Sequence, residues 1–191
     1  MYTRTSRILH WMFSYAIIFQ LISESLMKRP KPGRVRDEQQ IFFFEAHEYV
    51  GLLVLLLITL RLLYVMKKNQ WLELYPWISS AGVSAVLQEV KQVPGWFAGK
   101  LAMNLDSPLA KTVHGLGLLL ALALGITGCT MYLGMDADGT MRGVVHSAKE
   151  LHEGLGSLLW IYIIGHVGMV IFHQLKGHQV LQRIYSLRPD K

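Results

Sequence analysis

The sequence predicts an all-α fold, an integral membrane four-helix bundle in which a long loop between the second and third helices contains a short interfacial helix. Of its 191 residues, 52% are hydrophobic and only 17% are charged, whereas soluble domains carry about 25% charged residues. Charge is sparse in four stretches, near residues 8–27, 41–66, 112–133 and 154–175. Each stretch is close to the roughly 20 residues that cross a hydrocarbon core of about 30 Å. Composition therefore argues against a soluble enzyme, a nucleic-acid-binding module and a disordered chain.

Each apolar stretch is expected to be a helix, because backbone amides in lipid must be hydrogen-bonded within their own segment. We expect a single domain over residues 1–191, with spans at about residues 5–27, 41–66, 109–134 and 150–177. The side that holds the two termini carries 12 Lys and Arg residues and the opposite side carries 7. The positive-inside rule therefore predicts cytoplasmic termini. The loop KRPKPGRVRDE, with its five basic residues, argues for the opposite orientation.

The connection over residues 67–110 is long for a turn between two helices. Within it, SSAGVSAVLQEVKQV lies between Tyr75-Pro76-Trp77 and Pro94-Gly95-Trp96. Trp and Tyr prefer the membrane interface. The segment is thus expected to form a short helix on the membrane surface, bounded by these aromatic residues.

Histidines are the candidate functional residues, since five of the eight lie within or at the edges of the predicted spans. Ionisable groups in membrane helices are costly and usually functional, although a single histidine could equally be hydrogen-bonded to a neighbouring helix. His152 and His166 lie 14 residues apart on one predicted helix. This spacing leaves them within roughly 40° of one face and about 21 Å apart along the axis. One helix can therefore offer a ligand at each of two depths.

The predicted ligand type favours haem b. Neutral imidazoles from two facing helices suit a six-coordinate haem iron, and the chain has no C-x-x-C-H motif for covalent attachment. Zinc sites need three or four close ligands, whereas these histidines fall into separated pairs, which argues against zinc. The single Cys129 excludes a cysteine zinc site or an iron-sulfur cluster held by this chain alone. Glycines near the histidines could admit a macrocycle or serve tight helix packing; they are Gly51, Gly154, Gly156, Gly165 and Gly168.

The segments RILHW, FEAHEYVG and LHEGLGSLLWIYIIGH together resemble the bacterial di-haem cytochromes of the b-561 kind, which include b subunits of nickel-iron hydrogenases and formate dehydrogenases. The resemblance covers about residues 5–180. It implies two haem b groups in a bacterial inner membrane, an outer one held by His47 and His152 and an inner one held by His10 and His166. His166 is about 18 Å from the expected inner end of its helix, against about 11 Å for His10.

The resemblance also implies electron exchange with quinone, and Lys111, His114 and Asn104 are candidates for that site by location. The segment MNLDSPLAKTVHG does not closely match the quinone-binding segment of the dehydrogenase subunits, and a packed or solvated His114 is the alternative. His173 is an alternative haem ligand. It lies about 31 Å from His152 along the helix, which would put both sites at the membrane surfaces. His146 and His178 are expected in solvent.

The basic loop with Lys28, Arg29, Lys31, Arg34 and Arg36 could steer a periplasmic redox protein or superoxide to the outer haem, or simply be solvated. Three functions remain open. The first is a di-haem electron carrier in contact with membrane lipid and quinone, alone or as the anchor of a dehydrogenase. The second is a superoxide:quinone oxidoreductase, and the third is a histidine-lined metal transporter. Arg61 is expected to bind a haem propionate or to snorkel.

Overall fold

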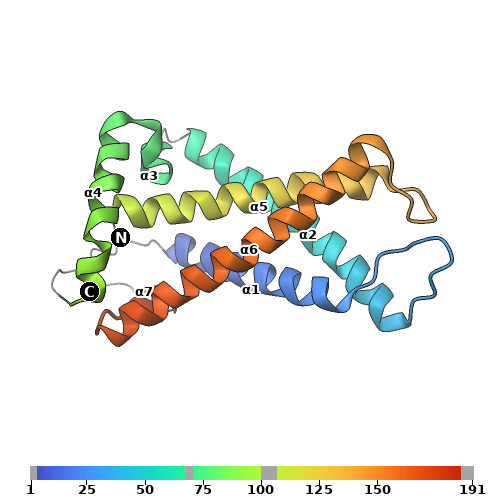
Figure 1. Ribbon diagram of the computed structural model, residues 1–191, viewed down its shortest axis with the longest axis horizontal. Coiled ribbons are helices and arrows are strands. Elements are labelled where there is room, and N and C mark those ends of the chain that lie inside the picture. Colours follow the sequence, from blue (N-terminus) through green and yellow to red (C-terminus); the bar gives the residue numbers. More distant parts are fainter. Residues whose placement is uncertain (1–3, 68–70, 100–106, 186–191) are drawn as a thin grey trace. The chain divides into compact units, whose positions relative to one another are not determined.

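The computed structural model describes residues 4–67, 71–99 and 107–185, and this part of the chain is helical with no strand, as predicted (Figure 1). The long helices are α1 (Arg4–Leu26), α2 (Glu38–Lys67), α5 (Pro108–Gly134) and α6 (Gly143–Leu175). Shorter elements are α3 (Trp71–Leu74), the 3-10 helix η1 (Pro76–Ile78), α4 (Ser80–Phe97) and α7 (Val180–Tyr185).

Within the described residues, α2, α5 and α6 are long and apolar enough to cross a membrane. The remaining predicted span, α1, has 23 residues and would extend about 35 Å, but it does not reach the same hydropathy. Polar side chains within it, such as Ser14, Gln20 and Ser23, lower its apolar character. The chain is a membrane protein, and a fourth crossing by α1 stays a prediction.

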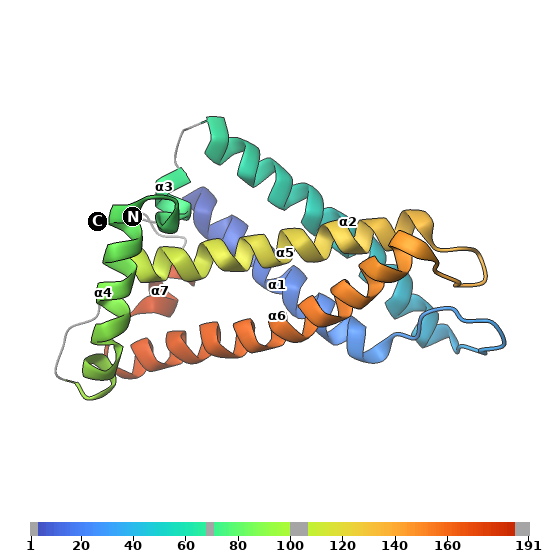
Figure 2. The same cartoon turned by 45° about the horizontal axis from the view of Figure 1, so that its top comes forward.

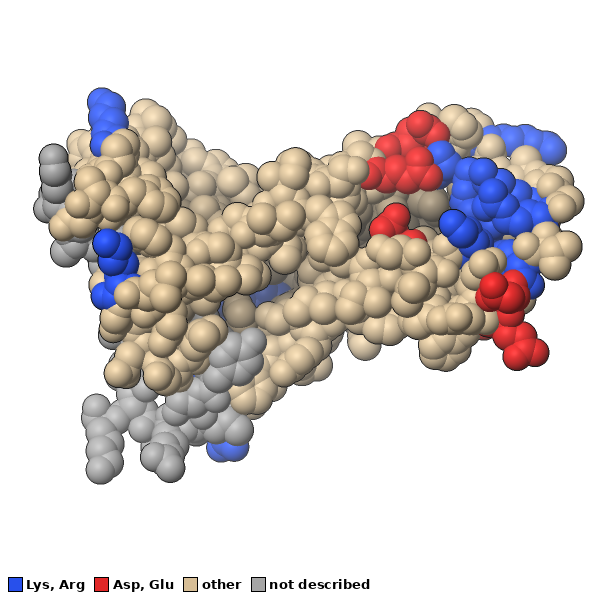
Figure 3. Space-filling view, turned by 60° about the horizontal axis from the view of Figure 1, so that its bottom comes forward, with Lys and Arg blue, Asp and Glu red and all other residues tan. Residues whose placement is uncertain are grey.

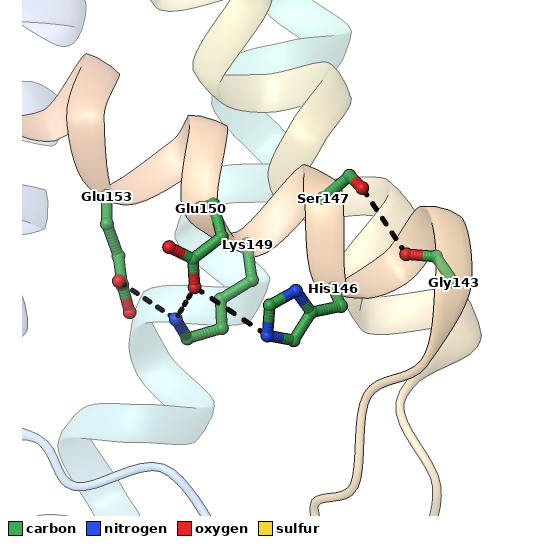
Figure 4. Close-up of polar contacts among 6 residues, drawn as sticks. All are labelled: Gly143, His146, Ser147, Lys149, Glu150 and Glu153. Carbon is green, nitrogen blue, oxygen red and sulfur yellow. Dashed lines mark hydrogen bonds and ion pairs between the residues drawn. The ribbon is translucent and has the colours of Figure 1, made fainter.

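Two helices, α2 and α6, start earlier than expected. Asp37 caps α2, because its carboxylate accepts the Gln40 N–H at 2.7 Å, so the helix begins three residues before the predicted position. The start of α6 at Gly143 is seven residues before the predicted 150. The added residues, GVVHSAK, are helical although they precede the apolar stretch. Figure 4 shows the ionic contacts of this turn, in which the Lys149 ammonium donates to Glu150 and Glu153.

The chain divides into two compact units, Met1–Leu56 with Ala123–Lys191, and Leu57–Leu122. The single domain expected over residues 1–191 stays a prediction. In the first unit, the α1–α2 loop touches the α5–α6 loop, where Gly139 lies against the Pro30 backbone with φ +83°. A Cβ at this glycine would collide with Pro30, so the contact between the loops requires glycine.

The second unit contains the connection between α2 and α5 (Figure 2). Ser79 caps α4 by accepting the Gly82 N–H at 3.0 Å, and Glu89 of α4 accepts the Leu109 N–H in the first turn of α5 at 2.7 Å. A helix was expected here, but it does not stop before Pro94. It continues to Phe97, since Pro94 is in the last turn and removes only one backbone donor. An exposed apolar stripe runs along this helix at Val83, Leu87, Val90 and Phe97.

Candidate haem site

His47 of α2 and His152 of α6 lie together in the first unit. Their ring centroids are 6.3 Å apart and their planes are inclined by 74°. Each histidine is nine residues from the first residue of its helix, Glu38 or Gly143, which is an axial distance of about 14 Å in both cases. They were expected close to the helix starts. The longer helices place both about two and a half turns inside, at matching positions.

Both imidazoles bind a hydroxyl group through Nδ1. Ser23 of α1 lies 2.9 Å from His47 Nδ1, and Thr127 of α5 lies 2.9 Å from His152 Nδ1. Side chains from α1, α2, α5 and α6 therefore meet around this histidine pair. Both hydroxyls are in the unit that contains the histidines, and both are largely buried.

The hydroxyl hydrogens decide the tautomer of each ring. Ser23 donates its hydrogen to the Gln20 carbonyl at 3.0 Å, and Thr127 donates to the carbonyls of Ala123 and Leu124 at 2.8 and 3.0 Å. With its hydrogen donated to the backbone, each hydroxyl oxygen is placed to accept from Nδ1–H of its histidine. Nε2 consequently carries the lone pair, which is the arrangement that metal-bound histidines show.

The surroundings of the pair hold the ring positions. The Gln20 amide donates to the His47 carbonyl at 2.9 Å, and an added Cβ at Gly51 would approach that same amide nitrogen at 3.2 Å. Gly128 is similarly tight, because its Cβ would come within 3.2 Å of His152 Cε1. The other expected glycines do not pack tightly, since an added Cβ has no described neighbour within 4 Å at Gly154, Gly156, Gly165 and Gly168.

The fit to haem iron can be tested by distance. A metal–imidazole bond is about 2.0–2.1 Å long and the bonding nitrogen lies about 1.1 Å from the centroid, so opposed imidazoles on one metal have centroids about 6.3 Å apart. The observed 6.3 Å between His47 and His152 meets this requirement. In the described residues, no group of three or more His, Cys, Asp or Glu is close enough to hold a metal ion. His47 and His152 would be the residues that hold a haem iron at this site, and the haem would supply one-electron redox chemistry.

His10 and His166 were expected to hold a second haem. His10 shows the same device, because Ser14 donates to the His10 carbonyl at 2.7 Å and its oxygen lies 3.3 Å from His10 Nδ1. The ring of His166 stacks on Tyr162, with centroids 5.6 Å apart and an angle of 11°. His10 is six residues from the start of α1 and His166 nine from the end of α6, about 9 and 14 Å. These two distances from the helix ends differ by less than was expected, and the pairing of His10 with His166 stays a prediction.

A family model described as prokaryotic cytochrome b561 matches residues 1–186. The chain belongs to the prokaryotic cytochrome b561 family. Neither a curated protein nor a solved structure shows significant similarity to the chain. Membership confirms the resemblance inferred from the histidine spacing, and it makes this chain a membrane cytochrome that transfers electrons through haem b.

Two of the three candidate quinone residues of this cytochrome, Lys111 and His114, lie in the second unit, on the first turns of α5. His114 donates its Nδ1–H to the Ala110 carbonyl at 2.7 Å and is half-buried, as is Lys111. The third candidate, Asn104, lies outside the described residues. Arg61, in the same unit, has its guanidinium 5.9 Å from the Tyr64 ring centroid. The quinone site stays a prediction.

Positive charge gathers on the loop between α1 and α2 of the cytochrome (Figure 3). Arg29 and then Arg34 lower the pKa of the exposed Lys31 ammonium, with a smaller contribution from Lys149 of α6. The same loop contacts the residues that precede α6, because Gly139 lies against the Pro30 backbone. Lys149 is itself neutralised by Glu150 and Glu153, and Glu150 also lies 3.8 Å from His146 (Figure 4).

Reasoning from ionisable residues alone missed Ser23, Thr127 and Gln20. Their signal was present, because each is a polar side chain in an otherwise apolar stretch, as in IFQLISES and GITGCT. A hydroxyl in a membrane helix can donate a hydrogen bond to a carbonyl of its own helix, however, so its presence does not reveal a partner on another helix.

Proposed function

We propose that this cytochrome carries electrons across the membrane through two haem b groups, one held by His47 and His152 and the other by His10 and His166. The observation that carries the proposal is the pair of histidine rings with centroids 6.3 Å apart, in which both Nδ1 atoms contact hydroxyls of other helices. Haem iron supplies the one-electron redox chemistry. Because His152 and His166 share α6 at a spacing of 14 residues, the two sites would be separated by about 21 Å along that helix.

The protein residues have positioning and electrostatic roles in this proposal. Ser23 and Thr127 keep the proton on Nδ1, so that Nε2 of each histidine can act as the ligand atom. Ser14 would do the same for His10. This use of polar side chains also supports α1 as a fourth span, since Ser23 and Gln20 are bound to the His47 residue rather than presented to lipid.

Haem quantitation on alanine variants tests the ligand assignment. Each ligand variant should retain one haem of two, while His114→Ala, in the second unit, should retain both. The exposed His146→Ala is a second control for the loss of an imidazole from α6. Full haem content in any ligand variant would show that the substituted histidine does not hold haem. The four ligand variants are His10→Ala, His47→Ala, His152→Ala and His166→Ala.

Electron exchange with the quinone pool is the proposed second half-reaction, with Lys111 and His114 as binding residues. His114 is held in place by the bond from its Nδ1–H to the Ala110 carbonyl, and an imidazole has the hydrogen-bonding chemistry that a quinone or quinol recognises. Quinol oxidation should be slower in His114→Gln at unchanged haem content, and an unchanged rate would reject His114 from the site.

We further propose a bacterial inner-membrane location with cytoplasmic termini and α4 on the membrane surface.

A superoxide:quinone oxidoreductase is the second candidate, favoured by the positive loop near the first turns of α6. Two superoxide anions would each give up one electron and leave as dioxygen, while one quinone takes up two electrons and two protons. Attraction by Arg29, Lys31 and Arg34 predicts that the rate falls as ionic strength rises. If superoxide reduces added quinone no faster with the protein than without it, this activity is absent. The loop would then suit an acidic periplasmic redox protein or a dehydrogenase subunit.

A further inference from the structure

A second histidine pair lies at the C-terminal end of α6, outside the four proposed haem ligands. His173 Nδ1 is 3.1 Å from His178 Nδ1, and the ring centroids are 5.4 Å apart with an angle of 33°. Both residues are half-buried. His178 was expected in solvent and His173 was considered as a haem ligand, but the two rings instead contact each other.

Backbone hydrogen bonds fix the turn that brings these rings together. The His178 N–H donates to the His173 carbonyl at 3.0 Å and the Gly177 N–H donates to the Gln174 carbonyl at 3.1 Å. Gly177 has φ +83°. This is the Schellman ending of a helix, in which the residues corresponding to His173 and His178 regularly make a side-chain contact. The contact is usually apolar, and here it is made by two imidazoles.

The distance between the nitrogens suits a chelated metal ion. For metal–nitrogen bonds of about 2.0–2.1 Å, a nitrogen separation of 3.1 Å corresponds to a bond angle of about 100°. That angle lies between the square-planar and tetrahedral values, both of which transition metals adopt with imidazole ligands. Both Nδ1 atoms are therefore within reach of one metal ion, and the rings would turn so that their lone pairs converge on the metal instead of on each other.

We propose that His173 and His178 form a binding site for a divalent transition metal ion, Cu²⁺, Ni²⁺ or Zn²⁺, bound through both Nδ1 atoms. In the metal-free protein one Nδ1–H donates to the other Nδ1. Metal binding requires that proton to move from Nδ1 to Nε2 of the same ring through solvent, so that both rings are neutral, carry their proton on Nε2 and bind the metal through Nδ1. The described residues supply no third close ligand, so water completes the coordination, and Cu²⁺ should bind most tightly of the three.

The site is distinct from the proposed haem positions. His173 follows His166 by seven residues on α6, which is an axial distance of about 10 Å. The nearby Lys176 ammonium lies 5.6 Å from the Phe172 ring centroid, an interaction that partly occupies this cation away from the pair.

The test is a Cu²⁺ titration of the full-length, tag-free, haem-containing protein after chelator treatment, followed by calorimetry and by electron paramagnetic resonance. The wild type should bind one equivalent whose hyperfine pattern contains two nitrogens. His173→Ala and His178→Ala should each weaken this binding by about tenfold or more, since even the loss of a partner outside the ligand shell costs 10–100-fold. His146→Ala is the matched control, because it removes an exposed imidazole from the opposite end of α6 and should leave the affinity unchanged.

Haem content, measured on the same samples, separates this proposal from the haem assignment. Weakened Cu²⁺ binding at unchanged haem content in both variants supports the site. Unchanged Cu²⁺ affinity in His178→Ala overturns it, as does loss of haem in His173→Ala, which would make His173 a haem ligand. Neither result depends on whether His10 and His166 hold the second haem.

Discussion

Thr127→Val tests how the proposed haem ligand His152 is held. The substitution keeps the shape of the side chain and removes the oxygen that accepts Nδ1–H of His152 at 2.9 Å. The helix should persist, because Thr127 is within α5 and its hydroxyl only adds a second donor to carbonyls of the preceding turn. The Leu124 carbonyl also interacts with His152 and remains as an alternative acceptor.

The size of the effect follows from this partial replacement. A buried donor left without an acceptor costs about 1–3 kcal/mol, and the alternative acceptor places the loss near 1 kcal/mol. A hydrogen bond from Nδ1–H makes the imidazole a stronger ligand, which favours the more positive ferric iron. If the substitution destabilises the ferric state by about 1 kcal/mol relative to the ferrous state, the midpoint potential of that haem should rise by roughly 40 mV.

A redox titration followed through the haem absorption bands measures this shift. One of two midpoint potentials should rise in Thr127→Val, and Ser23→Ala should raise the same one, since Ser23 binds the opposed His47. Thr130→Val is the matched control, because Thr130 is on the same helix and, among the described residues, its hydroxyl donates to the Ile126 carbonyl at 2.9 Å rather than contacting a histidine. If Thr127→Val leaves both potentials at their wild-type values, or if Ser23→Ala moves the other potential, the two hydroxyls do not serve one haem.

Three further predictions concern other parts of the molecule. Ser14→Ala should shift the potential that Thr127→Val leaves unchanged, because Ser14 contacts His10; a shift of the same potential would place both residues at one haem. Gly139→Ala should lower the melting temperature more than Gly33→Ala, because both glycines have positive φ but only Gly139 lies against backbone, that of Pro30; equal losses would contradict the contact between the loops. The position of α4 on the membrane surface can be tested with spin labels in a Cys129→Ser background. A label on Leu87→Cys should be more accessible to oxygen dissolved in lipid than to a water-soluble nickel chelate, and a label on Gln92→Cys should show the reverse. Equal accessibility at the two sites would place α4 away from the membrane surface.

The sequence alone determined the helical class, three of the membrane-crossing stretches and the family. These properties depend on residues close together in the chain. An apolar run of about 20 residues indicates by itself that the segment lies in lipid. The spacing of His152 and His166 on one helix follows from helical geometry. The interval between them is unaffected by where α6 begins, so the late predicted start at residue 150 did not disturb it.

Tertiary structure alone decided which side chains meet. Ser23 contacts His47 across 24 residues and Thr127 contacts His152 across 25, and no local pattern distinguishes these hydroxyls from others in apolar helices. Such contacts depend on the rotation and approach of neighbouring helices, which the packing of many side chains decides together. The His173–His178 contact lies between these cases: its spacing is local, but it exists because Gly177 adopts a positive φ and the helix closes in a Schellman turn.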